Sequence, residues 1–118
     1  MSTAAELVQK RCVPCEGGIP VLSPGEAQKL AQSVPGWRLT NDGKVIRRDW
    51  RAKDFPTAID FFRRIAEIAE DENHHPDLHL TGYRNVAVEI STHAVGGLTE
   101  NDFILAAKID QLPIQLKS

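Results

Sequence analysis

The sequence lacks a long apolar run and a surplus of positive charge. Its 118 residues carry 14 Lys and Arg against 16 Asp and Glu, which gives a formal net charge of −2. This balance argues against wholesale binding to nucleic acid or to an anionic membrane, because no basic cluster is present. No apolar stretch approaches the ~20 residues that a membrane-spanning helix needs. We therefore expect neither nucleic acid nor a membrane as a partner.

The sequence also has little cysteine and no apolar block at its start, "MSTAAELVQKRC". A secretory signal peptide would need such a block, and two cysteines in a leaderless chain are typical of a reducing compartment. We expect a cytoplasmic protein. The hydrophobic content of 42% and charged content of 25% are ordinary globular values, and a chain of this length buries one core.

Residues 1–21 are interpreted as an N-terminal arm, followed by one domain at 22–118. The end of the arm, "CVPCEGGIP", is rich in Pro and Gly and is predicted to be irregular. Cys12 and Cys15 have the spacing of half a structural zinc site, but zinc takes four ligands and no second pair follows at finger spacing. We favour two free thiols here and predict no metal.

Capping and turn signals predict three helices and two hairpins. The helices lie within 22–34, 54–72 and 98–112, with Ser23, Asp54 and Thr99 as N-caps, and the hairpins lie at 37–50 and 77–93. The first hairpin turns at Asp42-Gly43, which supplies the positive φ angles of a tight turn. The order predicts an α+β, two-layer fold, in which three helices pack on one face of a four-stranded antiparallel sheet.

The helix within 54–72 has the clearest apolar face. Its members recur at steps of three and four and form one broad stripe: Phe55, Ala58, Ile59, Phe62, Ile65, Ala66 and Ala69. The helix must end near Asn73, because a residue before proline is disfavoured in the α region and His75 precedes Pro76. The two adjacent histidines therefore lie between a helix and a strand.

Three of the four histidines lie in "ENHHPDLHL", residues 72–80. A helix C-terminus favours a histidine by itself, so the cluster has a purely structural explanation. A metal site from His75 and His79 with Glu70 or Asp77 is a second explanation. Against it, the chain lacks H-E-x-x-H, and adjacent residues on an extended backbone point to opposite sides.

Proton transfer is the third explanation. Imidazole, with an ordinary pKa of ~6.5, can donate or accept a proton at neutral pH. Glu70, one helical turn before His74, is placed to fix a tautomer or hold a charge. No nucleophile signature such as G-x-S-x-G is present, so chemistry here would be acid–base catalysis without a covalent intermediate.

The same residues resemble the signature of the pterin-4a-carbinolamine dehydratases. The matching segments are Glu70, "HHP" at 74–76, Tyr83, "STH" at 91–93, "GGLTEND" at 96–102, and, flanking them, "PGW" at 35–37, "DF" at 54–55 and "LAAKID" at 105–110. The resemblance covers residues 22 to 112, nearly the whole predicted domain, which makes it far more specific than a short motif. The arm also resembles an extension found in some members.

The resemblance implies a hydro-lyase that converts 4a-hydroxytetrahydropterin to quinonoid dihydropterin and water. This reaction recycles the tetrahydrobiopterin-type cofactor of aromatic amino-acid hydroxylases. It implies a small-molecule pterin substrate, no metal or organic cofactor, and a homodimer or homotetramer. The main alternative is a non-catalytic dimerisation cofactor of a transcription factor, a role that some members have. A metal-dependent hydrolase built on the same histidines is a third.

Carried over by position, the family's catalytic residues fall on His74, His75 and His93. Its pterin-contacting positions fall on Trp37, Glu70, Pro76, Thr92, Ala94, Val95 and Asp102. Asp102 also fits a helix cap, and Trp37 also fits a core position. His79 matches no functional position and is expected to be a solvated strand residue. Because His75 precedes a proline, we expect its side chain to be the more rigidly held of the pair.

Overall fold

Four antiparallel strands form one sheet in the order β1-β2-β4-β3. The computed structural model describes residues 3–13 and 20–118. Its strands are β1 (Arg38–Thr40), β2 (Val45–Arg51), β3 (Asp77–Thr81) and β4 (Asn85–Ile90). Its helices are α1 (Ala4–Gln9), α2 (Pro24–Ala31), α3 (Phe55–Glu72) and α4 (Glu100–Asp110), with a 3₁₀ turn, η1 (His93–Val95).

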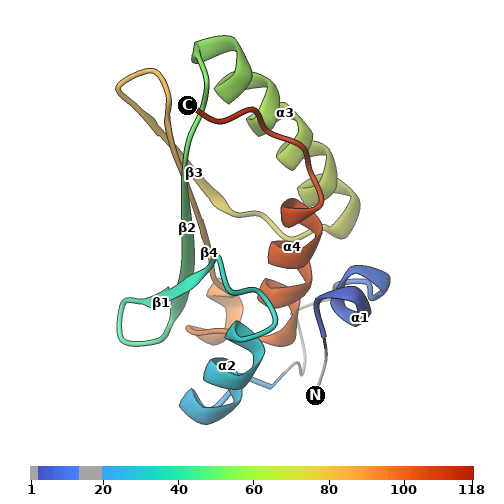
Figure 1. Ribbon diagram of the computed structural model, residues 1–118. Helices are drawn as coiled ribbons and strands as arrows, with labels where there is room; N and C mark the ends of the chain where they lie inside the picture. The colour runs from blue at the N-terminus through green and yellow to red at the C-terminus, as the bar shows by residue number, and fades with distance from the viewer. Residues whose placement is uncertain (1–2, 14–19) are drawn as a thin grey trace.

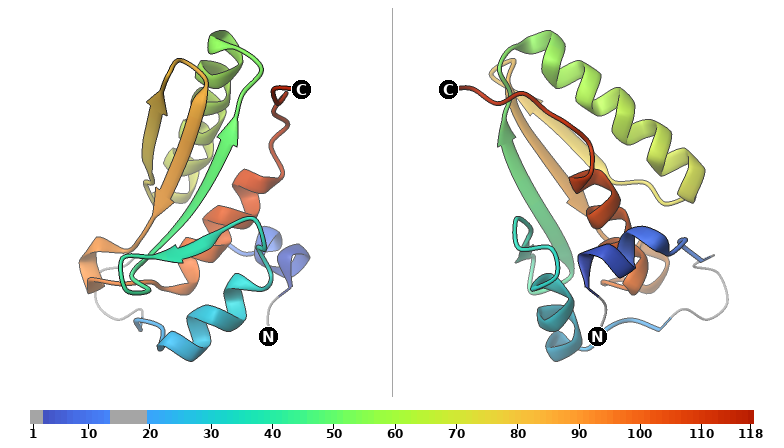
Figure 2. Two further views of the ribbon diagram at one scale, coloured as in Figure 1. Left: turned by 60° about the vertical axis from the view of Figure 1, so that its left-hand side comes forward. Right: turned by 45° about the vertical axis from the view of Figure 1, so that its right-hand side comes forward.

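The helices gather on one side of the sheet. Figure 2 shows α3 and α4 along the same face, with α2 at the end near β1 and α1 against α4. The core between the layers is built from fully buried side chains of β2, β4 and α4, among them Ile46, Ile90 and Phe103. The predicted α+β fold, with an antiparallel four-stranded sheet covered on one face, is confirmed.

Local signals set the helix boundaries as expected. The Ser23 hydroxyl accepts the Glu26 N–H at 3.2 Å, while the Glu26 carboxylate accepts the Ser23 N–H at 2.9 Å, so α2 begins with a complete capping box. The Asp54 carboxylate caps α3 through the Thr57 N–H at 2.9 Å. Asn73 ends that helix in the left-handed conformation, with φ of 52°. This reversal directs the chain from α3 into β3.

The predicted apolar stripe of α3 is partly wrong. Phe55 and Ile59 are 50% and 46% exposed, whereas Phe61, which the stripe omitted, is 2% exposed and packs edge-on against Trp50 at 5.0 Å between ring centroids. The residues that α3 buries are Ala58, Phe61, Ile65, Ala69 and Glu72. Apolar residues occur on two sides of this helix, so periodicity alone could not choose the buried side.

The first part of the N-terminal arm, for which the sequence predicted no helix, is helical. Residues 4–9 form α1, the Thr3 hydroxyl accepts the Glu6 N–H at 3.2 Å, and Leu7 is fully buried. Figure 1 shows α1 lying against α4. Burial of Leu7 stabilises a helix that would be too short to form alone. Cys15 lies outside the described residues, so the pairing of the two thiols stays a prediction.

Candidate active site

His74 is turned inward by the end of α3. Its backbone N–H donates to the Ala69 carbonyl at 3.1 Å, within the turn closed by Asn73. Its Nε2 lies 2.6 Å from Asp102 Oδ1, and the residue is 6% exposed. A carboxylate at hydrogen-bond distance fixes the plane of an imidazole ring. His74 is therefore the most firmly held histidine of the cluster.

Asp102 joins three elements at the start of α4. It is fully buried, and its Oδ2 accepts the Thr99 N–H and the Thr92 hydroxyl, each at 2.8 Å. The Thr92 and Thr99 hydroxyl oxygens lie 2.9 Å apart. Asp102 is thus both the predicted cap and a partner of His74. These hydrogen bonds offset the cost of burying the Asp102 carboxyl group.

His75 points outward, away from His74. Its side chain is 58% exposed, and its Nε2 lies 2.5 Å from Glu70 Oε2. Two expectations are corrected here: Glu70 orients His75 and not His74, and His74 is more rigidly held than the residue before Pro76. The opposite directions of the two rings agree with the expectation that the pair cannot share one ion.

His93 begins η1 beside the His74–Asp102 pair. His74 Nε2 and the Thr92 hydroxyl both lie at hydrogen-bond distance from the Asp102 carboxylate, 2.6 Å from Oδ1 and 2.8 Å from Oδ2. His93 follows Thr92 directly and lines a pocket of about 430 Å³ together with Asp77, Glu89, Ser91 and Thr92, and with residues of the β1–β2 turn and Gly96-Gly97. The structure therefore brings two separate motifs of the sequence to one end of the sheet.

The remaining residues around the site have simpler environments. Pro76 is half-buried before β3, Ala94 is exposed, and Val95 is half-buried. The Val95 N–H donates to the Thr92 carbonyl at 3.2 Å, which closes η1. Asp77 is a pocket-lining carboxylate that the sequence suggested only as a metal ligand. The strand register was the signal that could have placed it here.

Trp37 lies apart from these residues. It is 3% exposed, and its indole N–H donates to Asp110 at 3.0 Å. Asp110 is eight residues after Asp102 along α4, which is about 12 Å of helix. Burial raises the pKa of Asp110 above its ordinary value, although Trp37 and Arg48 both donate to it. Within this chain Trp37 has a core position, and its predicted contact with pterin gains no support.

His79 faces the sheet surface that the helices leave open. Its side chain is 45% exposed, and its Nε2 lies 2.6 Å from Glu89 Oε1. It is a solvated strand histidine, as expected. No group of three His, Cys, Asp or Glu side chains with metal-binding geometry occurs within residues 3–13 and 20–118. In the same ranges, no helix is long and apolar enough to cross a membrane.

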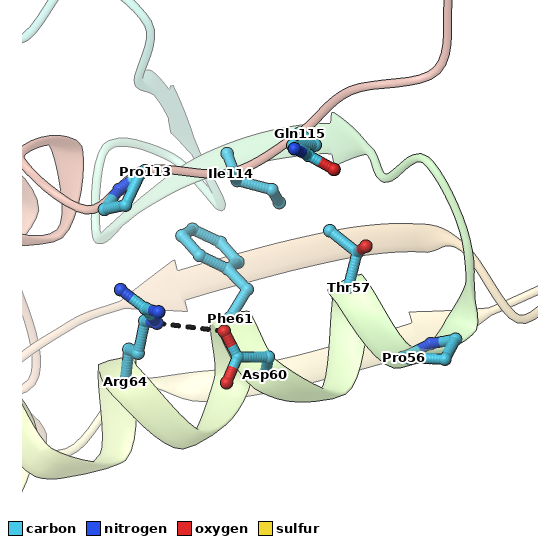
Figure 3. A pocket seen from close by; sticks show the side chains of 8 residues that line it. All are labelled: Pro56, Thr57, Asp60, Phe61, Arg64, Pro113, Ile114 and Gln115. Atoms are coloured by element: carbon cyan, nitrogen blue, oxygen red, sulfur yellow. Dashed lines mark hydrogen bonds and ion pairs between the residues drawn. The ribbon is translucent and has the colours of Figure 1, made fainter.

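A second pocket lies between α3 and the C-terminal segment (Figure 3). Its volume is about 470 Å³, and Phe61, Ile114 and the Arg64–Asp60 ion pair contribute to its lining. None of the predicted site residues lines it. The His93 pocket, which Thr92 and His93 line although His74 and His75 do not, is therefore the candidate active site.

The chain matches one known protein family over most of its length. Residues 20–112 match the family described as pterin 4 alpha carbinolamine dehydratase. The chain belongs to this family. The resemblance seen in the sequence is therefore confirmed, and with it the expected enzyme class, a hydro-lyase.

Individual members of the dehydratase family are similar over most of the chain. Pterin-4-alpha-carbinolamine dehydratase 2, mitochondrial, of Arabidopsis thaliana is 54% identical over 94% of this chain, which spans 61% of that protein's length. A Methylococcus capsulatus protein that carries the family name is 46% identical over 92% of this chain and 95% of its own. A crystal structure described as a transcriptional coactivator/pterin dehydratase from Brucella melitensis has a TM-score of 0.72 at 32% identity, over 77% of this chain and 96% of its own.

Proposed function

We propose that this protein dehydrates 4a-hydroxytetrahydropterin to quinonoid dihydropterin by histidine acid–base catalysis. The observation that carries the proposal is that His74 and Thr92, the neighbour of His93, both bond to the buried carboxylate of Asp102. Family membership supplies the substrate class. The recycling of a tetrahydrobiopterin-type cofactor is the role that this reaction would serve.

The reaction needs a proton at one atom and the loss of a proton at another. The C4a–O bond breaks as the N5 lone pair forms a double bond to C4a. The leaving hydroxyl takes a proton and departs as water, and N5 gives up its proton. No oxidant or reductant enters this balance. General acid–base catalysis of such steps contributes ~10²–10⁴-fold.

The environments of the three histidines support two kinds of role. His75 and His93 are exposed, so their rings can reach a bound substrate. Because Nε2 of His75 faces Glu70, its Nδ1 is left to face the pterin. His74 is buried and held by Asp102, and we propose that it forms the floor of the site and orients the pterin. Neither a metal nor an organic cofactor has a part in this proposal.

The exposed apolar side of α3 supports the expected homo-oligomer. Phe55 and Ile59, one helical turn apart, are both about half exposed in the single chain. A second copy of the chain is the occupant that the resemblance suggests. The expected cytoplasmic location stays a prediction, because the name of the Arabidopsis relative includes the word mitochondrial.

Synthetic 4a-hydroxytetrahydropterin provides the test. Its dehydration would be followed by ultraviolet absorbance with and without the protein, over a range of protein concentrations. We expect a rate that rises in proportion to the protein and that survives treatment with EDTA. A rate equal to the spontaneous background would refute the proposed activity and favour the interaction role. Loss of the rate with EDTA and its return with zinc would favour the metal-dependent hydrolase.

A further inference from the structure

Residues 11–13 contact the last residue of α3 and the first turn of α4, the two helix ends beside the buried His74–Asp102 pair. The Cys12 N–H donates to Glu72 Oε1 at 2.8 Å, at the last residue of α3. The Val13 N–H donates to Asn101 Oδ1 at 3.0 Å, and the Asn101 Nδ2 donates to the Val13 carbonyl at 2.8 Å, in the first turn of α4. The N–H and the C=O of Val13 thus both bond to one side-chain amide, in the way that a residue of an antiparallel sheet bonds to the residue opposite it.

Glu72 is the centre of this contact. Its side chain is 2% exposed, and its Oε2 accepts Lys108 Nζ from α4 at 2.6 Å. Arg11 approaches the same oxygen at 3.5 Å. One buried carboxylate thereby joins α3, α4 and the N-terminal segment. Removing any donor from such a group is expensive, because the charge is left incompletely paired.

The contact lies directly beside the His74–Asp102 pair in the chain. Glu72 is two residues before His74, and only the left-handed Asn73 separates them. Asn101 immediately precedes Asp102. The 2.6 Å approach of His74 to Asp102 therefore depends on how the end of α3 is placed against the start of α4. Both of these ends are held by residues 11–13.

We propose that residues 11–13, Glu72 and Asn101 form a clip that positions His74 against Asp102. Glu72 and Asn101 are positioning residues in this arrangement, since they act through their neighbours. The inference rests on the proposed function only in taking the His74–Asp102 pair as part of the active site. It makes the backbone of the N-terminal arm a support for the helix ends beside the site, although the family match begins at residue 20.

A substitution at Val13 tests the clip without altering either helix. Val13 is 52% exposed, so the protein uses its backbone more than its side chain. Val13→Pro removes the N–H that donates to Asn101, whereas the matched control Val13→Ala keeps it. We expect Val13→Pro to lower kcat about three- to tenfold with KM within twofold, because one net hydrogen bond is lost and misplacement affects the chemical step. Val13→Ala should stay within twofold of the wild type in both constants.

The ¹⁵N chemical shifts of the His74 ring provide a second measurement that does not require activity. Val13→Pro should shift the His74 Nε2 resonance, and Val13→Ala should leave it in place. Glu72→Gln should act in the same direction as Val13→Pro. Identical His74 spectra and kcat values for the two Val13 variants would overturn the clip. A wild-type protein without dehydratase activity, but with the expected spectral difference, would instead overturn the proposed function and keep the clip.

Discussion

Asp102→Asn is the substitution that tests the site most directly. The Thr99 N–H can only donate, so the atom at the Oδ2 position must remain an acceptor. The carbonyl oxygen of asparagine would take that position, and its NH₂ group would face His74 Nε2 in place of Oδ1. Two donors would then meet unless His74 moves its proton to Nδ1. The variant therefore reverses the tautomer of His74 and removes the buried charge.

The expected loss follows from the bond that is replaced. A hydrogen bond to a charged group contributes about 1.5–3 kcal/mol, and each 1.36 kcal/mol is tenfold in rate, so kcat should fall about 10- to 150-fold. The bonds to Thr92 and Thr99 survive, so the free energy of unfolding should fall by less, about 1–2 kcal/mol. For a chain of this size, that is a Tm lower by several degrees.

The assay combines stopped-flow absorbance of pterin dehydration with thermal unfolding followed by circular dichroism. Asp60→Asn is the matched control, because it makes the same chemical change at a side chain that is 46% exposed and pairs with arginines of its own helix. It should leave kcat within twofold of the wild type. A kcat for Asp102→Asn that also stays within twofold would show that the carboxylate has no part in orienting His74 for the reaction.

Three further predictions address other parts of the molecule. His75→Ala should lower kcat/KM about 10²–10⁴-fold through loss of a proton carrier, while His79→Ala should have little effect, and equal losses would contradict the assignment. Burial and the negative charge of Glu72 raise the pKa of Cys12 from 9.0 to about 12, so alkylation of Cys12 by iodoacetamide, followed by mass spectrometry, should be about 10³-fold slower than for an ordinary thiol and should become fast in urea. Burial alone would raise the pKa of Glu72, but the hydrogen bonds from Lys108 and from the Cys12 N–H lower it by more, so the pKa lies below the ordinary 4.5. The stabilisation by Glu72 is therefore complete above about pH 4.5 and is lost as the pH falls through the folded value. The difference in free energy of unfolding between wild type and Glu72→Gln, measured in urea, should therefore become smaller in acid.

The parts of the fold that depend on neighbours in sequence could be predicted. The side chains of Ser23 and Asp54 bond to backbone three residues ahead, so a helix start is readable from a few letters. The end of α3 could likewise be predicted, from Asn73 and the proline three residues later. The family signature predicted that the histidines share one site, and the structure joins the His74 and Thr92 segments through Asp102.

The parts that depend on long-range packing could not be predicted. Both sides of α3 carry apolar residues, and the choice of Phe61 over Ile59 for the core depends on Trp50, which comes from another element. Likewise α1 is only six residues long and depends on burial of Leu7 against α4. Which histidine Glu70 would bind also depended on the conformation of Asn73, and helical spacing alone favoured the wrong one.

The contacts of the N-terminal segment also fix when the site can form during synthesis. Val13 and Asn101 are 88 residues apart in the chain, which a ribosome adding about 5–20 residues per second covers in roughly 4 to 18 s. Until then the segment can bond only to the end of α3, through Arg11 to Asp71 and Cys12 to Glu72, while the β3–β4 hairpin needs only its own 14 residues, 77–90, to pair. Glu72 and His74 are synthesised well before Lys108 and Asp102, which later bury their polar groups. The His74–Asp102 contact can thus form only late on a nascent chain, and a chain released before residue 101 would have a formed hairpin but no held His74.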